Sequence, residues 1–495
     1  MTLIAFEEWR PDLAPINAGS ANALNVIRVQ DGYEVIFSPE PIGFVTLEDY
    51  PKKLFVGVSS AGVKLPIVLC ENASYRGTGN SLVMCAGSDI GPSEDWSYTQ
   101  YGDFVYAVDG RNQLRKISID ANGEFQLVPV DNGLSARFIA TVAQFVMLAD
   151  IREFDGNDRY PFRLKWSGLQ RPDRYENQPN AIQSDFQDIQ DIGTIRGLTG
   201  GEFAIVLGSI GIARGDYVGP DIIFKFTTIE TNVGCDIPNS VVRTGDQTFF
   251  WSNRGWRVTN GGVSQAIGVG KVDLWFRRTL DAEYINRFSS IVLANYPIVM
   301  WSFVSVFSVD KTPDTILAYN WEQESWTYGP IRAQILGTTV LPPVYTDDDN
   351  LPLSGYVPGE STTDDYDVLT DTDVNIYEQP AAMVDGSLCR LVQSGNIEAQ
   401  LETREFAIDP NNVKRLGHFM PVVHSATDVI GKVKSRDTQT DEVYRIRDNL
   451  KRERSGRISC RSNARFFTIG LRLSGPFKRA LGVDAQAVEP VASKR

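Results

Sequence analysis

Short apolar segments with a period of two recur along most of this chain, and they constrain its fold more than any other feature. Side chains that alternate between apolar and polar belong to strands with one buried face. The segments include GDFVYAVDG, FQLVPVDNG, RFIATVAQFVMLAD, FAIVLGS, GIARGDYVG, TFFWSNRGWRVTNGG, IVLANYPIVMWSFVSV and TILAYNWEQESWTYG. Dipeptides that favour tight turns lie between them, namely Asp109-Gly110, Asn132-Gly133 and Asn260-Gly261. We therefore expect an all-β fold.

The segments group into packets spaced by roughly 45–50 residues, the length of a four-stranded propeller blade. The packets are Tyr101–Ile117, Phe138–Leu169, Ile195–Phe226, Val241–Gly268 and Phe288–Gly329. This spacing predicts a β-propeller of about six blades over residues 1–335, with N-terminal strands as candidates to close the ring. One helix is expected in KVDLWFRRTLDAEYINRF, where five apolar side chains share a face: Val272, Trp275, Phe276, Leu280 and Tyr284.

The packets stop near residue 335, and three further parts are expected. Residues 336–380 are predicted to be an acidic insertion or loop, because 341–380 holds ten Asp and Glu and no Lys or Arg. Residues 381–485 alternate again, as in RFFTIGLRLSG, and predict an additional C-terminal antiparallel β-module. The last residues, 486–495, are expected to be a flexible tail.

Charge is spread unevenly along the 495 residues, whose formal net charge is −14. Residues 431–495 hold sixteen Lys and Arg against seven Asp and Glu. A mostly acidic surface repels phosphate, which argues against nonspecific DNA binding over most of the molecule. The basic end is expected to face an acidic partner, or to neutralise the acidic body of its own or a neighbouring subunit.

Cysteine and histidine supply little material for chemistry. The five cysteines, Cys70, Cys85, Cys235, Cys389 and Cys460, are scattered and odd in number, which fits a reducing compartment. The two histidines, His418 and His424, are six residues apart, which fits no common ligand spacing. We expect no metal site and no cofactor, and we interpret both histidines as surface or core residues.

Two glycine motifs resemble known signatures but fail on their details. Gly200-Gly201-Glu202-Phe203 is similar to the signature of cyclic-dinucleotide synthases, yet it lacks one acidic residue and lies between two predicted strands. Gly270-Lys271 is similar to the end of a P-loop, but Gln265 stands at the first glycine position and Val272 replaces the magnesium-binding hydroxyl. We expect the first motif to be a hairpin turn and reject the second.

Carboxylate clusters and tryptophans are the remaining candidates for a site. The clusters are Asp185, Asp188 and Asp191, and Asp364, Asp365 and Asp367. The first cluster lacks the Gly and distal Glu of a calcium loop, and capping and turn formation explain such Asp residues better. Seven tryptophans are expected to pack between blades rather than to stack on ligands: Trp166, Trp251, Trp256, Trp275, Trp301, Trp321 and Trp326. With no GxSxG elbow either, we expect no catalytic residues and no enzymatic activity.

Neither membrane insertion nor secretion is indicated. No stretch approaches the roughly 18 consecutive apolar residues of a membrane helix. The N-terminal MTLIAFEEWRPDLAP lacks the basic and apolar regions of a signal peptide.

The order of several segments resembles a family of structural proteins from short-tailed bacteriophages, the tail hub or nozzle proteins related to packaged-DNA stabilisation. The matching segments cover nearly the whole chain. They are EEWRPDLAPINAGSANALNVIRVQDGYEVI, DWSYTQYGDFVYAVDG, ARFIATVAQFVML, RLKWSGLQRPDRY, ILAYNWEQESWTYGP and RSNARFFTIGLRLSGPFKRALGVDAQAVEP, together with the most specific block, from DFQDIQDIG to GKVDLWF. The acidic stretch 341–380 matches poorly.

The resemblance implies a structural virion protein in the virion tail, assembled in the host cytoplasm. Such proteins are β-propellers that form homo-oligomeric rings, typically hexamers, which extend the portal–adaptor channel, retain packaged DNA and conduct it during ejection. The implied partners are the head-to-tail connector and tail fibre or needle proteins. Double-stranded DNA would pass without specific binding. The residues of a gate are unknown, and loops near 341–380 are candidates because of their acidity and poor match.

Two other interpretations of the sequence remain open. A tail-associated glycan-binding adhesin or depolymerase would account for the carboxylates and aromatics, although a parallel β-helix and a Gly/Ser-rich stalk are not visible. A cellular propeller that serves as an interaction scaffold would carry regular WD or kelch signatures, which are absent from the sequence.

Overall fold

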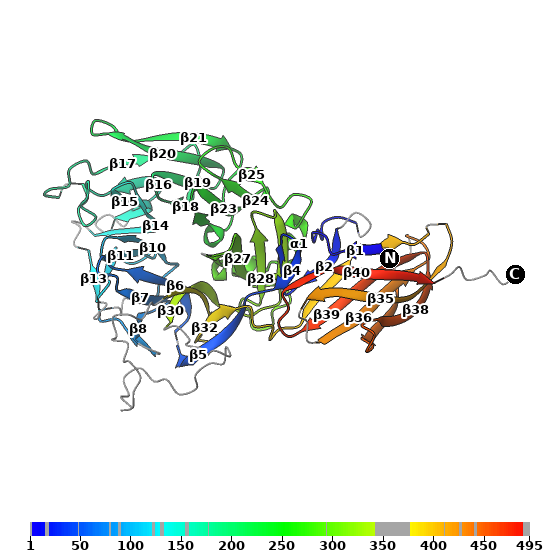
Figure 1. Ribbon diagram of the computed structural model, residues 1–495. Coiled ribbons are helices and arrows are strands. Elements are labelled where there is room, and N and C mark those ends of the chain that lie inside the picture. The colour runs from blue at the N-terminus through cyan, green and yellow to red at the C-terminus, as the bar shows by residue number, and fades with distance from the viewer. Residues whose placement is uncertain are drawn as a thin grey trace, which may run out of the picture.

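The computed structural model describes most of the chain. The described residues are 2–14, 19–47, 49–78, 81–87, 91–120, 124–128, 133–153, 158–176, 178–293, 295–341, 377–409, 411–424, 428–439 and 443–488. They form a β-propeller with a β-sandwich beside it (Figure 1). The all-β propeller and the additional antiparallel module that the sequence predicts are confirmed.

The propeller has seven four-stranded antiparallel blades in the described part of the chain, one more than the spacing predicted. In chain order, blades 1 to 6 are β6 (Pro51–Val58) to β9 (Ser81–Met84), β10 (Ser97–Tyr101) to β13 (Phe125–Leu127), β14 (Leu134–Val142) to β17 (Asp185–Asp188), β18 (Ile195–Thr199) to β21 (Ile223–Thr231), β22 (Val242–Thr244) to β25 (Gln265–Ala266), and β26 (Ser289–Leu293) to β29 (Ser325–Gly329). The first strand of each blade is the innermost. The five predicted packets correspond to blades 2 to 6.

The strands between those limits complete the six blades. They are β7 (Lys64–Cys70), β8 (Ser74–Thr78), β11 (Phe104–Val108), β12 (Arg115–Ser118), β15 (Phe145–Glu153), β16 (Asp158–Trp166), β19 (Phe203–Gly208), β20 (Gly211–Gly219), β23 (Gln247–Ser252), β24 (Gly255–Thr259), β27 (Ile298–Phe303) and β28 (Thr315–Asn320).

Blade 7 draws its strands from distant parts of the chain. The inner three are β30 (Ile335–Leu341), β31 (Tyr377–Val384) and β32 (Ser387–Val392), and the outermost is β5 (Ser38–Thr46), which pairs with β32. An N-terminal strand thus completes the last blade of the ring. The divisions expected at 335 and 381 differ from this topology, because both ends of residues 342–376 are anchored within one hairpin of blade 7.

Each junction between neighbouring blades has its own apolar cluster, which explains why seven blades close without a shared central core. Separate clusters fill the junctions between blades 1 and 2, 2 and 3, 3 and 4, 4 and 5, 6 and 7, and 7 and 1. The largest cluster lies between blades 5 and 6 and continues into the sandwich. In this arrangement, the strands bury side chains on both of their faces, and this burial stabilises the propeller.

The sandwich combines the N-terminal strands with the last third of the chain. One sheet contains β1 (Thr2–Ala5), β3 (Val26–Val29), β4 (Gly32–Val35), β40 (Arg479–Val488), β35 (Lys414–His424) and β38 (Ile458–Ala464). The other contains β2 (Ser20–Leu24), β33 (Ala399–Thr403), β34 (Phe406–Ala407), β39 (Phe466–Ser474), β36 (Asp428–Arg436) and β37 (Arg445–Lys451). Buried side chains from both sheets share one cluster.

The propeller and the sandwich are joined at blade 6. Strand β2 pairs in parallel with β29 at Leu24 and Tyr328, so the second sheet of the sandwich continues the sheet of that blade. Trp9 stacks on Tyr328 with ring centroids 4.6 Å apart and meets Trp275 edge-on at 5.1 Å. Aromatic packing of this kind makes the junction a continuous core rather than a flexible linker.

The predicted helix is interrupted. The α-helix α1 (Asp273–Thr279) is followed by the 3₁₀ helix η2 (Ala282–Arg287), and a further 3₁₀ turn, η1 (Pro238–Ser240), precedes blade 5. Leu280 lies between α1 and η2 in an extended conformation and forms a β-bridge with Ser305. This pairing with blade 6 ends the helix earlier than its apolar face predicts.

Candidate functional site at the propeller mouth

Two adjoining cavities lie on one face of the propeller, where the innermost strands begin; we call it the cavity face. One, of about 140 Å³, reaches blades 1 to 5 through residues that include Lys53, Arg137 and Asn239. The other, of about 180 Å³, is bordered by residues that include Tyr50 and Arg287. Asp95 lines both cavities. Volumes of this size hold a few waters or a benzene-sized molecule.

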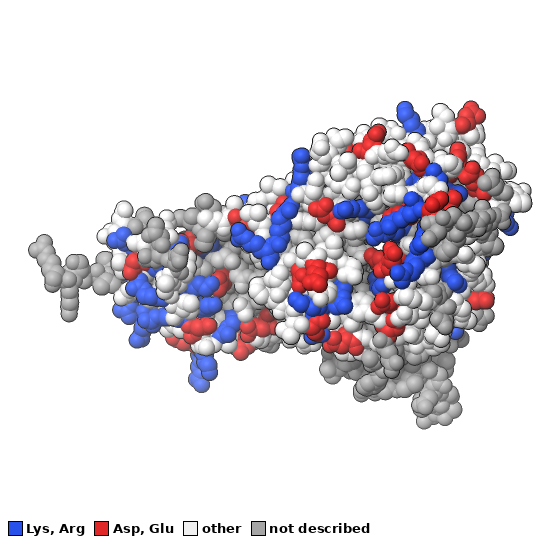
Figure 2. Space-filling view, turned by 180° about the vertical axis from the view of Figure 1, so that it is seen from behind, with Lys and Arg blue, Asp and Glu red and all other residues white. Residues whose placement is uncertain are grey.

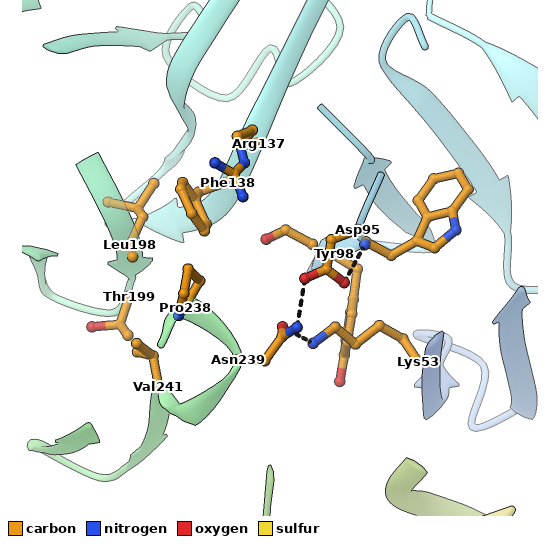
Figure 3. Close-up of a pocket in the computed structure, with 13 residues that line it drawn as sticks. Lys53, Asp95, Tyr98, Arg137, Phe138, Leu198, Thr199, Pro238, Asn239 and Val241 are labelled. Atoms are coloured by element: carbon orange, nitrogen blue, oxygen red, sulfur yellow. Dashed lines mark hydrogen bonds between the residues drawn. The ribbon is translucent and has the colours of Figure 1, made fainter. Parts of the chain in front are cut away.

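The polar side chains of the smaller cavity bond to one another (Figure 3). Lys53 on β6 donates to Oδ1 of Asn239 at 2.8 Å, and Asn239 on η1 donates to Oδ2 of Asp95 at 2.5 Å. The second oxygen of Asp95 accepts the backbone N–H of Trp96 at 2.9 Å. These groups brace the segments leading into blades 1, 2 and 5, and they use part of their hydrogen-bonding capacity on one another.

The larger cavity is edged by an aromatic–cation cluster. The guanidinium of Arg287 lies 5.2 Å from the ring centroids of both Tyr50 and Tyr284 and donates to the carbonyl of Lys311. Burial raises the pKa of Tyr50 to about 12, so its hydroxyl stays protonated at neutral pH and does not serve as a base.

Behind the cavities, inner strands of neighbouring blades contact one another directly. Ser97 and Thr99 on β10 bond to β14, at the backbone of Ile139 and at the hydroxyl of Thr141. At blades 3 and 4, the backbones approach so closely that a Cβ on Gly200 would lie 2.0 Å from the carbonyl of Thr141.

The two glycine motifs have structural roles. Gly200 and Gly201 form the β18–β19 hairpin, as predicted. Lys271 pairs with Glu8 at 2.9 Å. In the same segment, Gly268 leaves room for the carboxylate of Asp273, because a Cβ there would lie 2.0 Å from Oδ1.

The Asp cluster on blade 3 does not converge on a ligand position. Arg163 holds Asp188 through two hydrogen bonds of 2.7 and 3.0 Å, and this pairing lowers the pKa of Asp188. Asp185 accepts the backbone N–H of Phe186. Asp191 lines a separate cavity of about 290 Å³ together with Asp188. The other trio, Asp364, Asp365 and Asp367, and the candidate gate loops within 342–376 lie outside the described residues.

Cysteine, histidine and metal-binding groups add no reactive centre. All five thiols are free and buried, and burial raises their pKa, to about 11 for Cys85 and about 12 for Cys235. Thiols of this kind are poor nucleophiles. His418 and His424 both lie on β35 of the sandwich. Across the described ranges, no group of three or more His, Cys, Asp or Glu is placed to hold a metal ion.

The tryptophans pack within the protein rather than lining an open platform. Trp166 meets Phe224 between blades 3 and 4, with centroids 5.2 Å apart. Trp256, Trp301 and Trp326 join blades 5 and 6, with Trp256 and Trp301 at 4.3 Å. Trp275 and Trp321 are half-buried against the same cluster. These contacts agree with the packing role expected from the sequence.

Asp273, which the sequence did not single out, is the buried carboxyl with the clearest anomaly. It opens α1, is 8% exposed, and accepts the backbone N–H of Trp256 at 3.1 Å. Burial raises its pKa to about 6, with a smaller contribution from Asp12. Asp12 itself caps α1 through the N–H groups of Leu274 and Trp275. The arrangement is structural, because Asp273 is enclosed and serves the junction between blade 5 and the helix.

This raised pKa predicts a pH-dependent gain on neutralising the side chain. A carboxyl whose pKa rises from about 3.9 unfolded to about 6 folded stabilises the fold below pH 4, and this contribution is lost as pH rises through 6. Asp273→Asn should therefore gain about 2 kcal/mol in unfolding free energy relative to wild type between pH 4 and pH 7.5. Urea unfolding at both pH values tests this, and a difference that is the same at both would contradict it.

Comparisons with known proteins add fold-level likenesses only. No family model matches the chain, and no curated protein matches it. Among solved structures, BamB from Moraxella catarrhalis shares 10% identity with a TM-score of 0.35, covering 74% of this chain and 93% of that one. YCF48 bound to D1 peptide shares 10% identity with a TM-score of 0.35, covering 75% of this chain and 97% of that one. The computationally designed Ika8 protein shares 9% identity with a TM-score of 0.34, covering 70% of this chain and 99% of that one. Likenesses this distant carry no information about function.

No helix in the described part of the chain has the length and apolar character needed to cross a membrane.

Proposed function

We propose that this chain is a non-enzymatic structural subunit of a ring that forms the tail nozzle or hub of a short-tailed bacteriophage. In this role it extends the portal–adaptor channel, retains packaged DNA and conducts it during ejection. The sequence resemblance over nearly the whole chain supports the assignment. A propeller whose blades are joined by hydrogen bonds on the cavity face suits a mechanical part, because its stability comes from many separate junctions.

The observation that carries the proposal is a firmly held apolar loop on the cavity face. It connects β27 to β28 over residues 304–314 and exposes Phe307 by 80% and Val309 by 97%. Its base is fixed by two backbone bonds to residues 279–281, and Lys311 pairs with Asp281 at 3.0 Å. A rigid loop that exposes an aromatic side chain and a valine together is typical of a protein contact.

The proposed ring decides where a DNA channel would lie. In that ring, the proposed conduit is formed between copies of the chain around a common axis. A net charge of −14 fits such a wall, because it repels phosphate and lets DNA slide without binding. The proposed partners remain the portal–adaptor complex and tail fibre or needle proteins, in a virion tail assembled in the host cytoplasm.

The glycan-binding alternative has less support. None of the nine tryptophans, all of which lie in described ranges, is exposed as a platform for a sugar ring. Release of reducing sugars from host capsule or lipopolysaccharide would nevertheless favour the depolymerase interpretation.

Placing charges on the apolar loop should weaken assembly. Because Phe307 and Val309 would be desolvated in a contact, F307D/V309D is expected to raise the dissociation constant of self-association, or of binding to the portal–adaptor complex, by roughly 30-fold or more. The matched control is Ile182→Asp, at a side chain 70% exposed on blade 3. Sedimentation velocity provides the measurement. Equal assembly by F307D/V309D and the control would contradict the proposal.

A further inference from the structure

The open edge of the sandwich carries a cluster of cations. The edge strands of the two sheets, β37 and β38, are connected by residues 452–457, and Arg452 forms a β-bridge with Ile458. We call β37, β38 and this connection the basic edge. Residues 445–461 contain seven Lys and Arg and two Asp and Glu. Figure 2 shows cationic side chains gathering over the sandwich end of the molecule.

Most of these cations have no acidic partner among the described residues. Six exposed side chains form no ion pair with any described residue: Arg447, Lys451, Arg452, Arg454, Arg457 and Arg461. The neighbouring carboxylates are already engaged, since Asp448 pairs with Arg472 and Glu453 accepts from Ser455 and Ser459. The edge therefore presents positive charge that the described residues do not neutralise.

Apolar side chains next to the cations indicate the class of ligand. Val443 is 82% exposed and Ile446 is 59% exposed, close to Arg445 and Arg447. A polypeptide supplies both carboxylates and apolar side chains, whereas a nucleic-acid backbone supplies mainly phosphates. The acidic charge of the rest of the molecule also disfavours DNA. An acidic peptide with interspersed apolar residues fits the basic edge better.

Such a peptide exists within this chain. Residues 342–376 contain nine Asp and Glu, no Lys or Arg, and apolar residues that include Tyr356, Tyr366 and Leu369. The segment starts and ends at the outer end of the β30–β31 hairpin in blade 7, where Leu341 pairs with Tyr377. Figure 1 places β38 on the side of the sandwich away from the propeller, so the edge is open to a neighbouring molecule.

We propose that the basic edge of one chain binds the acidic segment 342–376 of a second copy. The inference rests on the proposed ring and deepens it by naming the contact between subunits. One surface on each chain meets a different surface on the next, which is the head-to-tail geometry that generates rings. Several such contacts around a ring would reinforce one another.

A binding experiment with the segment as a peptide tests the contact whether or not the purified chain assembles. A fluorescent peptide of residues 342–376 is expected to bind the full chain, with binding that falls when salt rises from roughly 50 to 500 mM. R447E/K451E/R454E should weaken it by about tenfold or more. The control K225E/R254E/R278E, which reverses three exposed cations on the propeller, should bind as wild type. Absence of peptide binding, or tighter binding of a DNA duplex at the same edge, would overturn the proposal.

Charge exchange then separates contact between copies from contact within one copy. R447E/K451E/R454E and D347K/D348K/D349K/D364K/D365K/D367K should each fail to assemble alone, because each then carries net charges of the same sign on its edge and its segment. Their equimolar mixture should assemble in a 1:1 ratio, because both contacts become complementary. A mixture that stays dissociated while wild type assembles would overturn the proposal and leave the ring intact. Wild type that forms no ring, yet binds the peptide, would contradict the proposed ring and not this contact.

Discussion

Replacing Trp256 by alanine is expected to lower the free energy of unfolding by about 3–5 kcal/mol. The indole is fully buried, and its ring centroid lies 4.3 Å from that of Trp301, 5.1 Å from Phe276 and 5.6 Å from Trp326. It therefore fills the point where blade 5, blade 6 and α1 meet, and its truncation leaves a cavity that three rigid elements do not collapse to fill.

The matched control is Trp321→Ala in the same cluster. Trp321 is half-buried and approaches Phe249 at 6.0 Å, so its loss should cost about 1 kcal/mol. Urea unfolding followed by circular dichroism measures both variants without depending on the tryptophan signal. If Trp256→Ala lost no more stability than Trp321→Ala, the junction of blades 5 and 6 would not be the main packing centre described here.

Breaking the ion pair between Arg436 and Glu405 should destabilise the sandwich by about 3–5 kcal/mol. Two hydrogen bonds of 2.6 Å join the side chains, and their exposed fractions are 9% and 0%. Removing either partner leaves a buried charge without compensation, and this penalty exceeds the value of the pair itself.

A paired substitution separates these two effects. Glu405→Leu with Arg436→Met removes both charges at once and should recover most of the loss, whereas each single substitution should not. The exposed pair of Arg332 and Asp385, at 48% and 66%, serves as the control, and its disruption should cost less than about 1 kcal/mol. Equal effects of the buried and exposed pairs in urea unfolding would contradict this account.

Local patterns in the sequence predict blades 2 to 6, each of which is contiguous in the chain, but they do not single out blade 1, although its strands β6 to β9 are also consecutive. Local patterns do not predict blade 7, because β5 joins strands that lie hundreds of residues later in the chain. In addition, residues 342–376 separate the two strands of its hairpin. The pairing of N-terminal strands with the C-terminal module is equally non-local. Periodicity reports which residues form strands but not which distant strands are neighbours.

The same distinction applies to the site. Lys53, Asp95 and Asn239 lie in three segments, each within or just before the inner strand of a different blade. No spacing in the sequence therefore links them. The apolar loop has a clearer signal, since Val304 and Val306 extend the alternation past the end of β27 before the Asp–Lys turn at 310–311. The buried environment of Asp273 cannot be predicted from the sequence, because it exists only in the folded protein, where the side chain lies beside Gly255 and Gly268.

The central claim, a ring-forming structural subunit, is tested most directly by the native mass of the full chain with negative-stain images of the same sample, alone and with portal–adaptor complex. The account predicts a ring of about six copies around an open channel, formed by the chain alone or on that complex. A chain that stays monomeric alone and does not bind the complex would contradict it.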